Sequence, residues 1–272
     1  AQTLTVTNGS TTFAGAIGDG GGLTVSGGTQ ALSGTNTYTG ATGIGAGATL
    51  ALTGTGSIAA SSGVAANGSF DLSATTAGAA ITTLSGSGAV ALGDQRLSIS
   101  NGSTSFDGAI GGTGGVTVAG GTQTLSGTNT YTGTTNIDAG ATLALTGTGS
   151  IATSTEVANN GTFRIADTSA GASITTLSGN GQVELGAQTL SLSNASTSFD
   201  GIISGAGGLA VAGGIQTLTG IQTYTGATSI DAGASLVLTG TGSLAASSGV
   251  AADGTFRIAE TASGASIATL SG

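Results

Sequence analysis

The chain has 272 residues, with 54 glycines, no proline, no cysteine and no histidine, and its formal net charge is −9 at pH 7. This composition excludes disulfides, thiolate or imidazole metal sites, and Ser-His or Cys-His catalysis. Nucleic acids and anionic membranes require a basic protein surface, which three cationic side chains do not supply.

The glycine content raises two alternatives, intrinsic disorder and collagen. Disordered chains combine low hydrophobicity with high charge, whereas this chain is 38% hydrophobic and only 6% charged. Glycine follows no three-residue period, as collagen would require. The sequence therefore indicates a folded chain.

No apolar run approaches the ~18 residues that span a bilayer, and no signal peptide opens the chain.

Tandem repeats with a period of 93 residues organise the chain. Tyr38, Tyr131 and Tyr224 occupy equivalent positions 93 residues apart, and the units span about residues 4–96, 97–189 and 190–272. A repeat array forms one continuous body, so we expect a single domain over residues 1–272. Neither end has the polar surface of a terminal repeat, so we expect the chain to be a segment of a longer protein.

Apolar and polar residues alternate in short runs, which is the period of a β-strand. Gly, Asn, Asp and Ser separate the runs and mark turns. In chain order, the strands predicted in the second unit are 97–99, 105–106, 116–118, 124–125, 136–137, 143–145, 151, 157, 163–165, 174–177 and 183–185.

The close spacing of these strands predicts an all-β parallel β-helix with three strands per coil. Coils of ~20–25 residues would give about four coils per unit and about a dozen in all, each advancing ~4.8 Å. The absence of proline agrees with this fold, because a proline would remove a donor from the ladder between coils.

The pattern also predicts which side chains point inward. All six phenylalanines keep one of two phases of the repeat, so we expect stacked core positions at Phe13, Phe70, Phe106, Phe163, Phe199 and Phe256. Charged residues appear where the units differ and should face solvent. Among them, Arg164 and Arg257 could form surface ion pairs with Asp167 and Glu260, respectively.

One block of the repeat is similar to a known family. Asn-Thr-Tyr-Thr-Gly at 36–40 and 129–133, followed by Ile44 or Ile137 and then Gly-Ala-Thr-Leu-Ala-Leu, resembles the autotransporter-associated β-strand repeat of bacterial type V secreted proteins. The third unit departs from the pattern at Ile221 and Gln222. The resemblance implies a right-handed parallel β-helix in a passenger on the bacterial cell surface. It also implies a C-terminal outer-membrane β-barrel elsewhere in the same precursor.

This block also provides the candidate adhesive face, a set of hydroxyl-rich residues that would bind a like passenger on a neighbouring cell or a host surface through many weak hydrogen bonds. Adhesion, autoaggregation or biofilm formation would follow. The alternative is a stalk or secretion-supporting scaffold that binds nothing. A third possibility, ice binding, would require Thr-x-Thr on every coil of one face. The candidate residues are Thr35, Asn36, Thr37, Thr39, Thr128, Asn129, Thr130, Thr132, Thr223 and Thr225.

Catalysis, cofactor binding and metal binding are not expected. The twelve acidic residues are spread thinly and offer no converging pair of carboxylates. Asp19 lies in a glycine-rich stretch, but calcium needs six to eight oxygen ligands, and the equivalent stretches 111–115 and 204–208 lack a carboxylate. We therefore expect Asp19 to be a turn residue.

Overall fold

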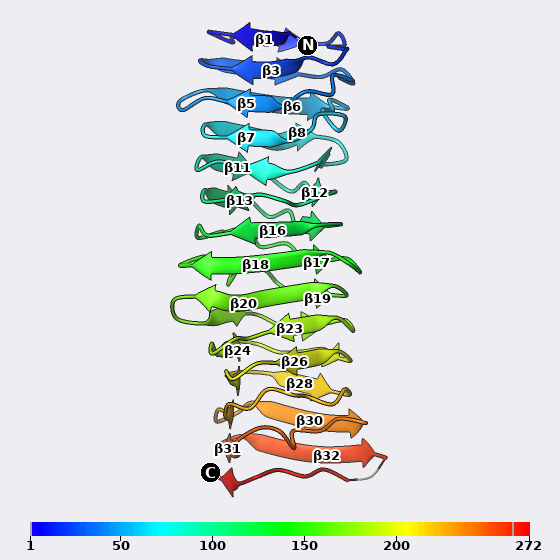
Figure 1. Cartoon of the computed structure of the whole chain (residues 1–272), viewed down its shortest axis with the longest axis vertical. Coiled ribbons are helices and arrows are strands. Elements are labelled where there is room, and N and C mark those ends of the chain that lie inside the picture. Colours follow the sequence, from blue (N-terminus) through cyan, green and yellow to red (C-terminus); the bar gives the residue numbers. More distant parts are fainter. Residues whose placement is uncertain (1, 263) are drawn as a thin grey trace. The chain divides into compact units, whose positions relative to one another are not determined.

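The computed structural model describes residues 2–262 and 264–272, and every regular element among them is a β-strand. The chain divides into two compact units, unit 1 (Ala1–Thr134) and unit 2 (Thr135–Gly272). In each unit the strands lie one above another in successive coils (Figure 1). The two units together comprise about 13 coils, so the predicted all-β parallel β-helix is confirmed.

Unit 1 contains the strands β1 to β16 (blue to green in Figure 1). Their bounds are β1 Thr3–Val6, β2 Thr12–Phe13, β3 Gly22–Val25, β4 Thr29–Leu32, β5 Thr42–Ile44, β6 Thr49–Gly54, β7 Val64–Ala66, β8 Ser69–Thr75, β9 Ala79–Ile81, β10 Leu84–Ser85, β11 Ala89–Ala91, β12 Leu97–Ile99, β13 Ser105–Phe106, β14 Ala109–Gly111, β15 Val116–Val118 and β16 Thr122–Leu125.

Unit 2 contains the strands β17 to β33 (green to red in Figure 1). Their bounds are β17 Thr135–Ile137, β18 Thr142–Gly147, β19 Val157–Asn159, β20 Thr162–Thr168, β21 Ala172–Ile174, β22 Leu177–Ser178, β23 Gln182–Glu184, β24 Leu190–Leu192, β25 Ser198–Phe199, β26 Ile202–Ser204, β27 Leu209–Val211, β28 Ile215–Leu218, β29 Thr228–Ile230, β30 Ser235–Gly240, β31 Val250–Ala252, β32 Thr255–Thr261 and β33 Leu270–Ser271.

Three sheets contain most strands of unit 1, and β13 and β16 pair with each other in a further sheet. The first sheet contains β1, β3, β5, β7 and β10, and the second contains β2, β4, β6, β8, β11 and β14. In the third sheet, β9, β12 and β15 pair with one another. All pairings between these strands are parallel, so each coil donates and accepts backbone hydrogen bonds along the direction of stacking.

The coil length follows from the strand register. In the first sheet Leu4 pairs with Leu23, Leu23 with Thr42, Thr42 with Val64, and Val64 with Leu84, so one coil takes between 19 and 22 residues. Alternate residues of each strand point inward, and the interior is filled by Leu, Ile, Val and Phe that are almost all 0–1% exposed. This buried column is the main stabilising element of the fold.

The 93-residue repeat is not a whole number of coils. Leu4 in the first sheet is equivalent to Leu97, which is in the third sheet, on β12. Between them the chain completes four full coils to Leu84 and then passes through β11 of the second sheet before reaching β12. Within unit 1, the second repeat therefore begins two sides, or two thirds of a turn, beyond the start of the first repeat.

Unit 2 shows the same relationship independently. The strands β18 and β30 are equivalent in the repeat, because Leu143 and Leu236 lie 93 residues apart. However, β18 belongs to the sheet that contains β20, β23 and β26, whereas β30 belongs to a sheet with β25, β28 and β32. Equivalent sequence is thus displayed on different sides within each unit.

Most of the strands predicted for the second repeat are present in the structure. The exceptions are Ile151, which is not in a strand, the segment 174–177, which divides between β21 and β22, and Leu185, which follows the end of β23. Ile151 is nevertheless buried, so its inward position agrees with the pattern even though the backbone there makes no ladder.

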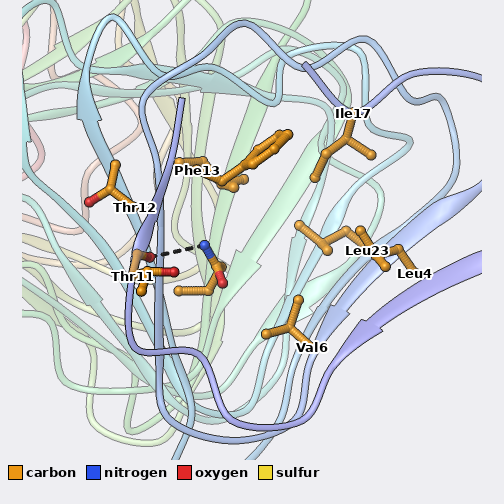
Figure 2. Close-up of a pocket in the computed structure, with 9 residues that line it drawn as sticks. Leu4, Val6, Thr11, Thr12, Phe13, Ile17 and Leu23 are labelled. Atoms are coloured by element: carbon orange, nitrogen blue, oxygen red, sulfur yellow. Dashed lines mark hydrogen bonds between the residues drawn. The ribbon is translucent and has the colours of Figure 1, made fainter. Parts of the chain in front are cut away.

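The phenylalanines follow the prediction except near the ends of the described coils. Phe70, Phe106, Phe163 and Phe199 are 0% exposed, whereas Phe13 is 43% exposed and Phe256 is half-buried. Phe13 lies in the first coil, where it lines an apolar hollow of about 230 Å³ with Leu4, Val6, Ile17 and Leu23. Figure 2 shows these side chains pointing toward the middle of the coil. The expected burial of Phe13 is wrong because no described coil covers it.

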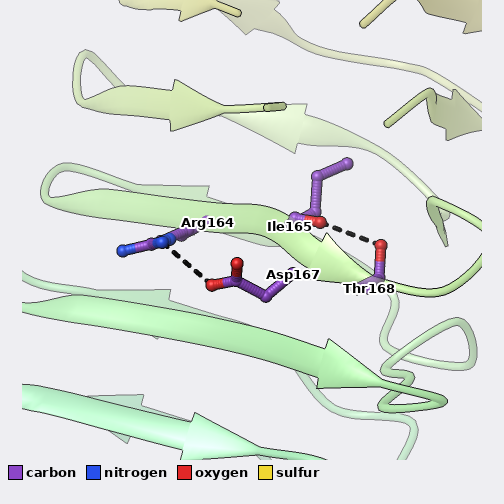
Figure 3. Close-up of polar contacts among 4 residues, drawn as sticks. All are labelled: Arg164, Ile165, Asp167 and Thr168. Atoms are coloured by element: carbon purple, nitrogen blue, oxygen red, sulfur yellow. Dashed lines mark hydrogen bonds and ion pairs between the residues drawn. The ribbon is translucent and has the colours of Figure 1, made fainter. Parts of the chain in front are cut away.

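The charged residues lie outside the core. Arg164 on β20 forms an ion pair with Asp167, with 2.9 Å between Nη2 and Oδ2 (Figure 3). Both side chains are about half exposed, so the pair contributes at most ~1 kcal/mol to stability. Within the described residues, Arg257 and Glu260 form no ion pair, which corrects the expected pairing there.

Candidate adhesive surface

The threonines of the Thr-Asn-Thr-Tyr-Thr block form exposed rows. In the first repeat, Thr35, Thr37 and Thr39 are exposed and constitute row 1. In the second, Thr128, Thr130 and Thr132 are exposed and constitute row 2. In the third, Thr223 and Thr225 are exposed and constitute row 3, with Ile221 in the place of the first threonine. The predicted outward direction is thus confirmed for all eight threonines.

The two asparagines of the candidate face point inward instead. Asn36 and Asn129 are each 2% exposed, so the expectation that they belong to the surface is wrong. The alternation of the strand explains this, because Asn36 has the same parity as the buried Tyr38. Sequence reasoning missed this signal, which was present in the spacing of the block.

Asn36 joins three successive coils by hydrogen bonds. Its Oδ1 accepts from the backbone N–H of Ile17 (3.0 Å), and its Nδ2 donates to the carbonyls of Gly34 and Ser57 (3.0 Å each). Asn129 makes the equivalent bonds with Ile110 N–H and the carbonyl of Gly127. The block itself forms no strand. The asparagine side chain therefore bonds to backbone groups of the coils on this side, where a strand ladder is absent.

Gln222 performs this role in the third repeat. Its Oε1 accepts from Ile203 N–H (2.8 Å), and its Nε2 donates to the carbonyls of Gly220 (2.7 Å) and Gly201 (3.2 Å). Gln222 therefore keeps the bond to the preceding coil, but its remaining bond also goes to that coil, whereas Asn36 bonds to Ser57 of the following coil.

The tyrosines of the block are buried and cannot contact a partner. Tyr38 is 1% exposed, and its hydroxyl lies 2.7 Å from Thr42 Oγ1, which in turn lies 2.9 Å from Ser61 Oγ. Tyr224 has the same arrangement with Thr228 (2.6 Å) and Ser247 (3.1 Å). Burial raises the pKa of Tyr224 to about 12 and also raises the pKa of Tyr38, while the threonine hydrogen bond lowers each.

A glycine lies beside the middle threonine of each of rows 1 and 2. A Cβ added to Gly18 would lie 3.5 Å from Thr37 Oγ1, and one added to Gly111 would lie 3.2 Å from Thr130 Oγ1. The neighbouring coil therefore contributes bare backbone where a larger side chain would cover the hydroxyls. Neither row contains a charged residue.

The two rows of unit 1 face different sides. Row 2 extends the second sheet, because Thr130 and Tyr131 donate their backbone N–H to the carbonyl of Ile110 on β14. Row 1 follows β4 of the second sheet and precedes β5 of the first, so it lies on the remaining side of its coil. The threonines do not build one continuous face in unit 1.

Other candidate sites received no support from the geometry. Across the described ranges, no group of three or more acidic residues is placed to hold a metal ion. Asp19 has a positive φ of 72° and occupies a turn, as expected. None of the described elements is a helix that could cross a membrane.

No protein family matches the chain, and no curated protein or solved structure matches it. The fold and the rows therefore have to be interpreted from their own chemistry.

Proposed function

We propose that the chain is an extracellular segment of a secreted bacterial passenger of the autotransporter type, and that it acts in adhesion and autoaggregation. The passenger would be held at the cell surface by an outer-membrane anchor outside this chain. The resemblance of the Asn-Thr-Tyr-Thr-Gly block and the parallel β-helix support this assignment. The chain has no cysteine, so no disulfide would hinder its export as an extended polypeptide.

The observation that supports an adhesive role is that the buried and the exposed residues of the block have different contacts. Its buried residues, Asn36 and Tyr38, make the contacts that hold the coils together. Its threonines are exposed, and the fold does not need them for the core. A repeated, exposed and uncharged set of hydroxyls suits multivalent binding, in which many weak hydrogen bonds act together.

The acidic charge of the chain sets the conditions for binding between like passengers. Two copies with a formal charge of −9 each repel one another, and salt screens this repulsion. We therefore expect cell settling driven by the chain to increase when the ionic strength rises from ~0.01 M to ~0.15 M, where the Debye length falls from ~30 Å to ~8 Å.

A structural stalk is the second candidate, and one observation favours it. Rows 1 and 2 lie on different sides, so a flat partner cannot engage both at once. A stalk would need only the buried column and the ladder between coils, and its outward threonines would be interchangeable with other polar residues.

One experiment separates the two functions. The chain is displayed on bacteria through an unrelated outer-membrane anchor, either unchanged or with Thr37→Asp, Thr130→Asp and Thr223→Asp together. Adhesion predicts that the triple substitution abolishes settling or attachment to host cells, because it places charges within the rows. The matched control is the same display with Ser10→Asp, Ser103→Asp and Ser196→Asp together, at exposed residues outside the rows. Unchanged settling and attachment in the triple variant would favour the stalk.

A further inference from the structure

The rotation of the repeat has a consequence for the geometry of self-association. Row 1 and row 2 have the same sequence, Thr-Asn-Thr-Tyr-Thr, and lie within the same compact unit. Row 2 extends the six-stranded sheet of β2, β4, β6, β8, β11 and β14. Row 1 lies on another side of the coil, where its backbone bonds to Ile17 and Thr35 bridges to Ser57.

We propose that each copy of the chain binds two other copies at once, through row 1 on one side and row 2 on another, so that copies assemble into growing chains and not into closed pairs. This inference rests on the proposed adhesive function and names its partner as a second copy of the same chain.

The chemistry of the rows favours a second copy as the partner. A threonine hydroxyl both donates and accepts a hydrogen bond, so a row of threonines is complementary to an identical row. A β-branched side chain is also stiff at χ1, so ordering it in a contact costs little conformational entropy. Carboxylates, in contrast, only accept hydrogen bonds and would repel their own kind.

The distribution of charge points to the same partner. Acidic side chains outnumber basic ones by twelve to three, so most approaches between two copies are repulsive. Rows 1 and 2 carry no charge, and the glycines beside Thr37 and Thr130 leave the hydroxyls uncovered. The rows themselves therefore bring no carboxylates together when two copies meet. The exposed Asp19 lies in the coil beside row 1, where its carbonyl accepts from Thr39 N–H.

The number of directions determines the product of association. Two rows on one side would engage the same partner copy, and association would stop at a dimer. Two rows on different sides cannot reach one rigid partner together, so each recruits its own copy and the assembly continues to grow. A single active row permits only a symmetric pair, because the contact is used up when two copies bind.

The test uses the whole chain with row 3 removed by Thr223→Asp and Thr225→Asp. In this background Thr37→Asp disables row 1, Thr130→Asp disables row 2, and Ser103→Asp is the charge-matched control. All five substituted positions are exposed, and circular dichroism verifies that each variant retains its strands. Light scattering coupled to sedimentation measures the mass from micromolar to millimolar concentration at physiological salt.

The inference predicts that the background and the Ser103→Asp control grow beyond the dimer with concentration. Each single-row variant stops at the dimer, and the variant without both rows stays a monomer. A background that stops at the dimer would overturn the inference, because both rows would then serve one partner. Unlimited growth in the single-row variants would also overturn it, by placing the contact elsewhere.

Failure of the inference and failure of the proposed function give different results. If all variants and the unchanged chain are monomers in solution, the inference is wrong. If bacteria displaying the unchanged chain still attach to host cells, adhesion survives with a different partner. If those bacteria neither settle nor attach, the proposed function falls as well.

Discussion

Leu4 and Leu97 are equivalent in the 93-residue repeat, yet they lie in different sheets of the same compact unit. Four coils and two further sides separate them, so the second copy of a closely similar sequence begins on a different side of the coil. The three sides of the coil must therefore accept the same inward residues. This equivalence explains why Leu, Ile, Val and Phe fill every side of the interior.

The buried column predicts a contrast between two equivalent phenylalanines. Phe106→Ala removes a fully buried ring and should reduce the free energy of unfolding by ~3–5 kcal/mol. Phe13→Ala removes a ring that is 43% exposed and should cause a markedly smaller loss. Urea unfolding followed by circular dichroism measures both. Equal losses at the two positions would contradict the observed difference in burial.

The inward asparagine predicts a different pair of outcomes. Asn36→Ala leaves the N–H of Ile17 without its acceptor, which should cost ~1–3 kcal/mol of stability where water cannot reach that group. The carbonyls of Gly34 and Ser57 each lose one of two donors, because both also accept a backbone N–H. Asn36→Gln should cost less, because Gln222 accepts from the equivalent N–H of Ile203 and donates to the equivalent carbonyl of Gly220 in the third repeat. If Asn36→Ala were neutral in thermal unfolding, the asparagine would not connect the coils.

Two glycines with positive φ differ in the space around them, so replacing each by alanine should have a different cost. Gly28 has a φ of 67°, and an added Cβ would lie 2.1 Å from the carbonyl oxygen of Gly9. Gly47 has a φ of 77° and open space around it. Gly47→Ala should therefore cost only the ~1–2 kcal/mol of the left-handed conformation.

Gly28→Ala should cost clearly more than Gly47→Ala, because the coil above must also move away. The midpoint of urea unfolding compares the two variants under identical conditions. Equal midpoints would show that the coils are not in contact at Gly28.

The buried tyrosine predicts a loss of stability at high pH. Burial raises the pKa of Tyr224 to about 12 in the folded chain, compared with the usual value of 10.0 for a tyrosine. Above pH 10 the unfolded chain therefore binds fewer protons than the folded one, and the free energy of unfolding falls as the pH rises toward 12. Tyr224→Phe should make this fall shallower while the bond between Thr228 and Ser247 remains.

Urea unfolding at a series of pH values, with tyrosinate absorbance as a second signal, checks this prediction. Tyrosinate from Tyr224 should appear together with unfolding. Ionisation of all three tyrosines near pH 10 in the folded chain would contradict the burial of their hydroxyls.

Much of the fold could be predicted from the sequence because alternation and turn residues act locally. The runs at 97–99 and 116–118 match β12 and β15 for this reason. The orientation of the repeats could not be predicted in this way, because coils vary from 19 to 22 residues and the phase depends on their sum. The sequence predicts about a dozen coils, with about four coils in each repeat, and this expectation contains no rotation between repeats.

The candidate surface was predictable in part. The threonines of the rows were identified from their composition and are exposed, as expected. The expected exposure of Asn36 and Asn129 rested on their polarity and not on the alternation of inward and outward residues. Both are buried, and their side chains bond to backbone groups of the neighbouring coil. That rows 1 and 2 face different sides depends on the phase of the coils and required the structure.

The rotation of the repeat can be measured directly by electron paramagnetic resonance, because the chain has no cysteine to interfere with spin labelling. The variant with Thr37→Cys and Thr130→Cys carries one label in each row, and the two positions are separated by ~22 Å along the stack. Ala31→Cys with Thr130→Cys is the reference, because Ala31 lies in line with Thr130 along the second sheet, five coils or ~24 Å away. We predict that the distance between the labels is longer for Thr37 and Thr130 than for Ala31 and Thr130, despite the shorter separation along the stack. An equal or shorter distance would place both rows on one side and contradict the account.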